Sequence, residues 1–330
     1  MAAGPWSSRF VGSHFFLPEP KADNEAWETI PPSWNGIRFD AIDVLFVSPF
    51  FLKADDDSSF VLGDGSNLNA RFEWVVRAAR SKNPNIKIIL EQFYHDEPET
   101  DYRAFHGDQG KIQRYAESVA AFIGEWHNKT LPALTGDGQV SARIDGFDVD
   151  VESSTKEADL PKVLAAVRAT LGALASRLNG PPFSVSITPA WTDFLDESIP
   201  SSCDYVNMQN YSGGVYTFAE NYLNAVHGLR KEQLVWGFAS EQPWRNSLTS
   251  FSQAREKVLE VVNGQTVGVY TWRINSDNYV YENIFQVWMY NLVHGVTLPD
   301  SREERIIEKY WPFGGRTGEN GPLILPQDLN

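Results

Sequence analysis

Three acidic side chains occupy alternate positions in the segment ARIDGFDVDVE, residues 142–152. Asp148, Asp150 and Glu152 are separated by single valines, in a stretch that is otherwise typical of a strand buried on both faces. Successive side chains of a β-strand point to opposite faces, so the three carboxyl groups share one face. Crowded carboxylates repel one another and resist desolvation, so we expect some of them to be protonated or strongly hydrogen-bonded. Because this arrangement costs stability, it indicates a function.

Other uses of three carboxyl groups are conceivable. Carboxylates bind Mg²⁺ or Ca²⁺, although metal sites usually draw their ligands from loops or from several strands. The six histidines show no HExxH-type spacing, which disfavours a metal site. A purely structural acid network is also disfavoured, because buried unpaired carboxylates are costly. We therefore expect neither a metal nor a cofactor.

Short apolar runs alternate with amphipathic segments along the whole chain. The candidate strands are residues 10–16, 41–51, 86–93, 143–152, 183–190, 204–211, 234–240 and 267–274, and the helical patterns are 69–81, 111–126, 159–178, 217–229, 252–262 and 279–293. Strands that are apolar on both faces and alternate with helices are typical of a parallel sheet, and eight of them predict an α/β fold, a single (β/α)₈ barrel. An open doubly wound sheet is the alternative, but no Gly-rich phosphate turn follows the first strand. Without a linker-like stretch, one domain over residues 1–330 is expected.

Polar and aromatic residues lie at the carboxyl ends of several predicted strands, where such barrels carry their chemistry. Glu152 ends the fourth strand, and Glu91 lies near the end of the third. Gln209 and Tyr211 end the sixth strand, and Trp272 lies near the end of the eighth. We expect these side chains to gather around one open end of the barrel.

Aromatic residues are frequent, with eleven tryptophans and 13% aromatic residues in total. Flat rings stack on the apolar faces of sugars or fill a large core. Trp191, which follows the fifth predicted strand, is a candidate sugar contact. Like Trp236 and Trp244, it could equally belong to the core, because periodicity does not show which way these side chains face.

Charge and hydropathy exclude some classes of partner. A formal net charge of -15 disfavours binding to nucleic acid, whose phosphates would be repelled. The sequence contains no run of eighteen apolar residues, so we expect no membrane span. The pattern is that of a soluble protein, which we expect to be a monomer. It would be cytoplasmic as written, or secreted if a signal peptide has been removed.

The segment DGFDVDVE (145–152) matches in full the signature DGxDxDxE of the family 18 glycoside hydrolases, which include chitinases and endo-β-N-acetylglucosaminidases. SVSITPA resembles the fifth strand of that family, DYVNMQNYSG the sixth and GVYTW the eighth. The chain departs from the family at its third strand, where LEQFYHDEPE replaces the usual Ser-x-Gly-Gly turn. The resemblance therefore does not extend to the shape of the adjoining subsite.

The resemblance implies a retaining hydrolysis in which the substrate's own 2-acetamido group is the nucleophile. Glu152 would act as general acid and base, Asp150 would orient the acetamido group, and Asp148 would share its proton. Tyr211 would donate to the acetamido group. Gln209 would line its pocket, and Trp272 would lie under the sugar ring.

The implied substrate is a β-1,4-linked glycan that contains N-acetylglucosamine, with chitin or chitooligosaccharides favoured. Cleavage of the chitobiose core of N-glycans is an alternative, because the Gln-x-Tyr pattern occurs in both subclasses. A non-catalytic chitinase-like lectin is a further alternative. It is disfavoured because lectin-like members typically lose the glutamate that is present here as Glu152.

Overall fold

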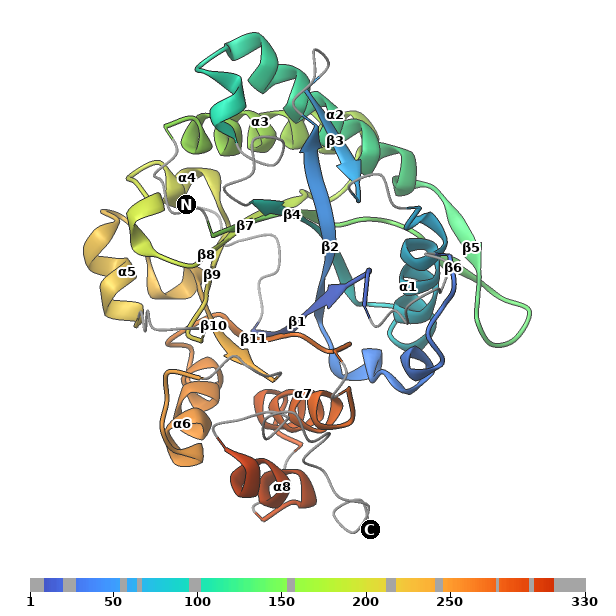
Figure 1. The fold of residues 1–330 in the computed structure, drawn as a ribbon, viewed down its shortest axis with the longest axis vertical. Coiled ribbons are helices and arrows are strands. Elements are labelled where there is room, and N and C mark those ends of the chain that lie inside the picture. Colours follow the sequence, from blue (N-terminus) through green and yellow to red (C-terminus); the bar gives the residue numbers. More distant parts are fainter. Residues whose placement is uncertain are drawn as a thin grey trace.

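Eight parallel strands close into a barrel at the centre of the protein (Figure 1). The computed structural model describes residues 9–19, 28–53, 58–63, 67–94, 102–152, 158–211, 218–240, 246–276, 279–296 and 300–311. The barrel strands are β1 (Phe10–Phe16), β2 (Val44–Lys53), β4 (Lys87–Tyr94), β7 (Gly146–Val151), β8 (Ser184–Pro189), β9 (Tyr205–Met208), β10 (Leu234–Ala239) and β11 (Gly268–Trp272). They pair in chain order, and β1 pairs with both β2 and β11, which closes the ring. The predicted (β/α)₈ barrel is confirmed.

The strands alternate between two apolar environments. Their outward side chains, such as Phe147, Val149 and Val151, belong to a large core cluster beneath the helices. A second, smaller cluster fills the barrel interior and includes Phe46 and Tyr270. Since both faces are buried, the strands have the near-continuous apolar character that the sequence shows.

Helices surround the barrel, as Figure 1 shows. They are α1 (Asn69–Lys82), α2 (Gln109–His127), α3 (Leu160–Leu178), α4 (Ile199–Ser202), α5 (Ala219–Ala225), α6 (Phe251–Val262), α7 (Tyr279–Val293) and α8 (Arg302–Tyr310). Short 3₁₀ helices cover residues 32–36, 39–41, 102–105, 192–194 and 231–233. Local signals set some helix starts: the Asp108 carboxylate accepts hydrogen bonds from the backbone N–H groups of Gly110 (2.7 Å) and Lys111 (3.1 Å) at the start of α2.

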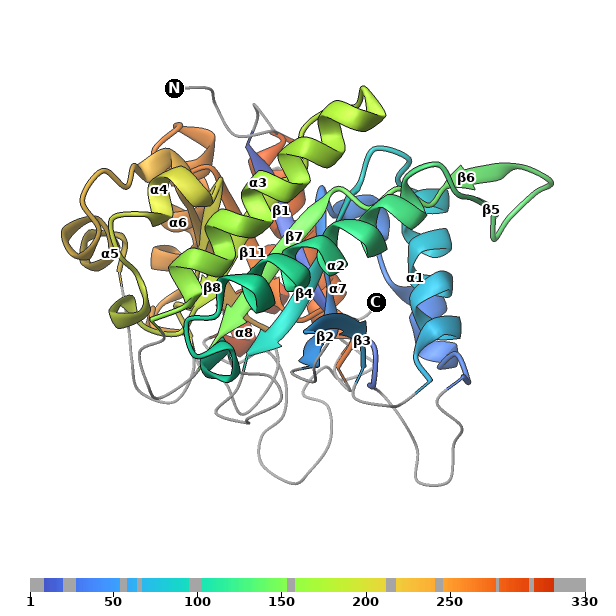
Figure 2. The ribbon, with the colours of Figure 1, turned by 90° about the horizontal axis from the view of Figure 1, so that it is seen from above.

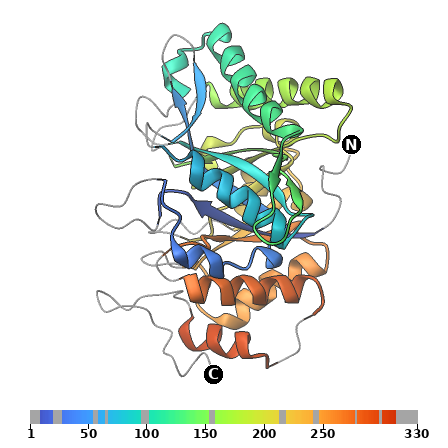
Figure 3. The same ribbon diagram turned by 90° about the vertical axis from the view of Figure 1, so that its right-hand side faces the viewer.

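Several elements of the described chain were not predicted from the sequence, among them α4 and the 3₁₀ helices. Strand β3 (Ser59–Leu62) pairs antiparallel with β2 at one side of the barrel. Strands β5 (Thr130–Pro132) and β6 (Gln139–Ser141) form a hairpin that projects away from the barrel (Figure 2). Helix α8 packs on the outer side of α7, as Figure 3 shows in red and orange. Glu304 fixes this helix, because its Oε1 accepts hydrogen bonds from Arg255 Nε at 3.1 Å and Trp288 Nε1 at 3.3 Å.

Candidate active site

The three acids of the DVDVE segment differ in depth along the inner face of β7. Asp148 is 0% exposed, Asp150 is 5% exposed, and Glu152, just after the strand ends, is exposed. The valines between them belong to the outer core. The strand alternation therefore turns all three carboxyl groups toward the barrel interior and its open carboxyl end.

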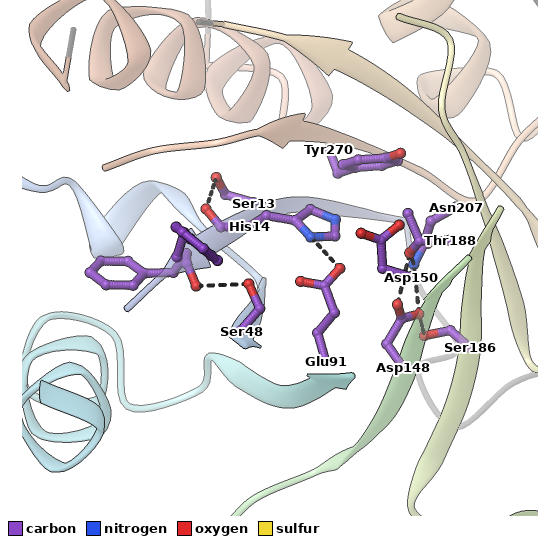
Figure 4. Close-up of polar contacts among 12 residues, drawn as sticks. Ser13, His14, Ser48, Glu91, Asp148, Asp150, Ser186, Thr188, Asn207 and Tyr270 are labelled. Atoms are coloured by element: carbon purple, nitrogen blue, oxygen red, sulfur yellow. Dashed lines mark hydrogen bonds and ion pairs between the residues drawn. The ribbon is translucent and has the colours of Figure 1, made fainter. Parts of the chain in front are cut away.

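Asp148 is held at the bottom by three donors (Figure 4). Its Oδ1 accepts hydrogen bonds from the Ser186 hydroxyl and from Asn207 Nδ2 (3.1 Å), and its Oδ2 accepts one from Thr188 Oγ1 (2.8 Å). Burial, together with the negative charge of Glu91, raises the pKa of Asp148 to about 7, against the opposing effect of these donors. Asp148 is therefore a carboxyl group that can hold a proton near neutral pH.

Asp150 lies above Asp148 and has one strong partner. Gln209 Nε2 donates to Asp150 Oδ1 at 2.8 Å and to the Thr188 carbonyl oxygen at 3.1 Å. Burial raises the pKa of Asp150 well above its usual value, and the charges of Glu152, Glu91 and Asp148 add to this effect. This carboxyl group can therefore donate or accept a hydrogen bond according to the charge of its neighbours.

Glu152 lies at the open end. Desolvation by the surrounding protein raises its pKa, hydrogen bonding by Gln209 opposes the shift, and the charge of Glu91 adds to it. The side chain is nevertheless exposed, so a ligand at the open end can reach it. A carboxyl group that is both accessible and reluctant to ionise suits a general acid.

Two tyrosines form one wall of the interior. The hydroxyl groups of Tyr211 and Tyr270 are 3.2 Å apart, and Tyr270 donates to the Met208 carbonyl oxygen at 3.1 Å. Since Tyr270 has a single hydroxyl proton, Tyr211 is the donor between the two. Gly237 leaves the space for this arrangement, because a Cβ there would lie 2.4 Å from the Met208 carbonyl oxygen and 2.5 Å from the Tyr270 hydroxyl oxygen.

Glu91 does not lie at the open end. Its side chain is 0% exposed and forms an ion pair with His14, whose Nδ1 is 2.7 Å from Glu91 Oε1. The expected contact of Glu91 with a substrate thus stays a prediction, and the structure places this carboxylate below the open end. The reason is the length of β4: the strand continues to Tyr94, so Phe93, and not Glu91, is its last inward-facing side chain described here.

Aromatic rings gather near the end of the barrel. Trp272 is half-buried and packs against the inner cluster, with its ring centroid 6.1 Å from that of Phe93 and 5.3 Å from that of His14. Phe93 in turn stacks on Phe16 at 5.2 Å. Trp191, in contrast, packs against the outer core and is half-buried. Of the two predicted tryptophan contacts, only Trp272 adjoins the inner cluster. Trp236, an uncertain case in the sequence, is buried in the outer core, and Trp244 lies outside the described residues.

The sequence reasoning missed several residues of the interior. The partners of Asp148 on β8 alternate with outward-facing Val185 and Ile187, by the same period-two pattern that marked the acids. His14 lies on the same strand face as Phe10 and Gly12 by the same rule. Alternation could have placed these side chains inside the barrel, but it could not have paired them with their partners.

No metal site is evident in the described part of the chain, where no group of three or more His, Cys, Asp or Glu side chains is arranged to hold an ion. Within the same ranges, no helix is both long enough and apolar enough to cross a membrane.

Comparisons of the sequence with known proteins gave no match, either to a family model or to a curated protein. Solved structures of similar shape exist. A class V chitinase from Nicotiana tobaccum has a TM-score of 0.61 at 11% identity, covering 86% of this chain and 99% of that one. A family 18 chitinase from Cycas revoluta in complex with (GlcNAc)3 has a TM-score of 0.62 at 12% identity, covering 87% and 100%. A chitinase-like agglutinin from Robinia pseudoacacia has a TM-score of 0.60 at 12% identity, covering 84% and 99%. The chain therefore shares the fold of chitinases and of a chitinase-like agglutinin.

Proposed function

We propose that this protein is a retaining glycoside hydrolase of the family 18 type, which cleaves β-1,4 bonds next to N-acetylglucosamine. The observation that carries the proposal is the ordering of the three acids by depth, from fully buried Asp148 through Asp150 to exposed Glu152. All three have raised pKa values, for which burial is the largest cause. The shared fold and the complete DGxDxDxE segment support the same proposal.

In this mechanism Glu152 protonates the glycosidic oxygen, and Asp150 accepts a hydrogen bond from the 2-acetamido N–H. The acetamido oxygen then attacks the anomeric carbon, and the aglycone leaves with the proton from Glu152. Asp148 takes up part of the charge that develops on Asp150 because its own proton is available near neutral pH. Glu152 afterwards removes a proton from the water that opens the cyclic intermediate, which restores the acid.

The remaining site residues would position the sugar. Tyr211 would turn its hydroxyl proton from Tyr270 to the acetamido oxygen when a sugar binds. Gln209 would keep Asp150 in place through its existing hydrogen bond, and Trp272 would lie beneath the ring. The related chitinase structure in complex with (GlcNAc)3 supports chitooligosaccharides as the favoured substrate.

The decisive variant is Glu152→Gln, which keeps the shape of the side chain but cannot donate an acidic proton. We expect hydrolysis to fall by at least about 100-fold, the usual contribution of a general acid, while binding of chitooligosaccharides persists. Glu220→Gln on the exposed surface of α5 is the matched control and should retain wild-type activity. A Glu152→Gln protein with more than a few per cent of the wild-type rate would exclude this role.

The substrate is decided by incubating the wild-type protein with chitohexaose and, separately, with a high-mannose glycopeptide, with the products read by mass. Shortened chitooligosaccharides are expected. Release of the mannose-bearing glycan with chitohexaose untouched would instead establish an endo-β-N-acetylglucosaminidase. Binding without cleavage of either compound would favour a lectin, the function class suggested by the agglutinin of the same fold.

A further inference from the structure

A buried ion pair lies inside the barrel, below its open end. The side chains of His14 and Glu91 are both 0% exposed, and their Nδ1 and Oε1 atoms are 2.7 Å apart. The imidazole ring stacks on Phe46, with centroids 4.7 Å apart, and lies 4.9 Å from the ring of Tyr270. A buried histidine–carboxylate pair is weak support for stability, because desolvation of the two groups consumes much of their attraction. The pair therefore calls for another explanation.

The pair faces the acids of β7. Glu91 on β4 is in register with Asp148 in the parallel ladder, and both side chains point inward. In Figure 4 the imidazole ring of His14 lies above the Glu91 carboxylate, and its far edge points toward Asp150. From β11, Tyr270 covers the other side of the ring.

The remaining surroundings of Glu91 carry few charges. Strand β2 contributes the apolar ring of Phe46 on the inner face, beside the imidazole. Toward the open end, Phe93 follows Glu91 on the same face of β4, and Glu152 is the carboxyl group that lies beyond it. Within the ranges that the structure describes, the titratable groups around Glu91 are thus His14, the three acids, and the Tyr270 phenol behind the imidazole.

The hydrogen bonds of the pair do not indicate a structural role. Among the described residues, His14 Nε2 and Glu91 Oε2 have no hydrogen-bond partner, although both atoms are buried. Its electrostatic effect is directed at the acids instead. The charge of Glu91 is the second largest cause of the raised pKa of Asp148, after burial, and it also raises the pKa of Asp150 and of Glu152.

We propose that the Glu91 carboxylate, held in place by His14, is a positioning element of the active site, which lies beside the three acids and sets the pH range over which they act. The inference rests on the proposed function, because it concerns the pH range of that reaction. In this proposal Glu91 does not act by touching the substrate, because its side chain is fully buried and Phe93 follows it on the same face of β4. It acts through Asp148 and Asp150.

The test is the pH dependence of kcat/KM in Glu91→Gln, which keeps the shape and removes the charge. Loss of the charge lowers the pKa of each acid. The decline of kcat/KM at high pH, called here the high-pH limb, should therefore move to lower pH by roughly one unit. Glu91→Asp retains the charge and should keep the limb near its wild-type position. A purely structural role would change the rate in these variants without moving the limb.

The chain offers a matched control, a second histidine–carboxylate pair. His294 Nε2 lies 2.9 Å from Asp43 Oδ2, and Asp43 immediately precedes β2, at the opposite end of the barrel. Asp43→Asn should leave the limb in place. A shift of equal size in this control would show that the effect is general and would overturn the proposal.

A second variant keeps the proposal testable if Glu91→Gln folds poorly. The double variant His14→Phe/Glu91→Met replaces the pair by apolar side chains, a change that proteins often tolerate well. The limb should again move to lower pH. The reason is that the charge of Glu91 affects the pKa of Asp148 more strongly than His14 does, and that it also raises the pKa of Asp150 and of Glu152.

A measurement without substrate separates this inference from the proposed function. The ¹³C carboxyl signal of Asp148, assigned with Asp148→Asn, is titrated in the wild type and in Glu91→Gln. A lower midpoint in the variant supports the pair's role, even if the wild type cleaves no glycan and the proposed function fails. An unchanged midpoint overturns it, whether or not the enzyme is active.

Discussion

Replacing Asp148 by Asn should make the protein more stable at neutral pH relative to the wild type. In the folded state this carboxyl group keeps its proton until about pH 7, whereas its ordinary pKa is 3.8. Between these values the folded state binds a proton that the unfolded state has lost, so raising the pH favours unfolding. A difference of about three pKa units corresponds to about 4 kcal/mol of unfolding free energy, lost by the wild type as the pH rises through this window.

The side-chain amide introduced by Asp148→Asn would be isosteric with the protonated acid: its oxygen could accept hydrogen bonds from Ser186 and Asn207, as Oδ1 does, and its NH2 group, in the place of Oδ2, could donate to the Thr188 hydroxyl oxygen. Urea unfolding of both proteins from pH 4 to pH 8 gives the difference in unfolding free energy. That difference should rise with pH in favour of the variant, by up to about 4 kcal/mol, and level off above pH 7.

The control for this experiment is Ser184→Ala, which removes a buried hydroxyl group from the interior without removing a titrating group. Its stability difference from the wild type should not depend on pH. Parallel curves for Asp148→Asn and the wild type would refute the reasoning, because they would mean that Asp148 ionises in the folded protein as it does in the unfolded chain.

Two further substitutions test the walls of the site. Gly237→Ala should lower the free energy of unfolding by at least about 2 kcal/mol, because the added methyl group would lie 2.5 Å from the Tyr270 hydroxyl oxygen; urea unfolding checks this, and wild-type stability would contradict it. Trp272→Ala should weaken binding of chitooligosaccharides about tenfold, or about 1.4 kcal/mol, by removing the ring beneath the sugar. Calorimetric titration measures this change in affinity. Trp236→Phe in the outer core is the control for Trp272→Ala, and an equal loss of affinity in both variants would argue against stacking of Trp272 on the sugar.

The barrel could be predicted because each of its strands is apolar on both faces, a property that the sequence displays directly. Every predicted strand appears within a few residues of its expected bounds, and so do the long helices. Strand β3 was missed because its four residues, SFVL, are too few for a periodicity, and its pairing with β2 is set by tertiary contacts. Helix α8 was missed although it is strongly amphipathic, because it follows the eighth strand and its helix, where the barrel pattern requires no further element.

The alternation of side chains along β7 likewise predicted that the three acids point to one face, but it did not predict which residues would contact them. The surroundings of Asp148 come from β4, β8 and β9, which are distant in sequence. An isolated histidine in a run of aromatic residues has no spacing to mark it, so the pairing of His14 with Glu91 required the closed barrel. The depth of Glu91 was not predicted either, because it depends on the register of β4 against β7 and on Phe93, which lies nearer the open end.

The strict alternation of β7 also limits how this protein can change over evolution. Inserting or deleting one residue within Gly146–Val151 would exchange the two faces of the strand. The acids would then enter the apolar layer beneath the helices, and Val149 and Val151 would fill the site. Insertions and deletions of a single residue in this strand are therefore expected to be selected against. The inward side chains can change by single substitutions, which keep the two faces of the strand as they are.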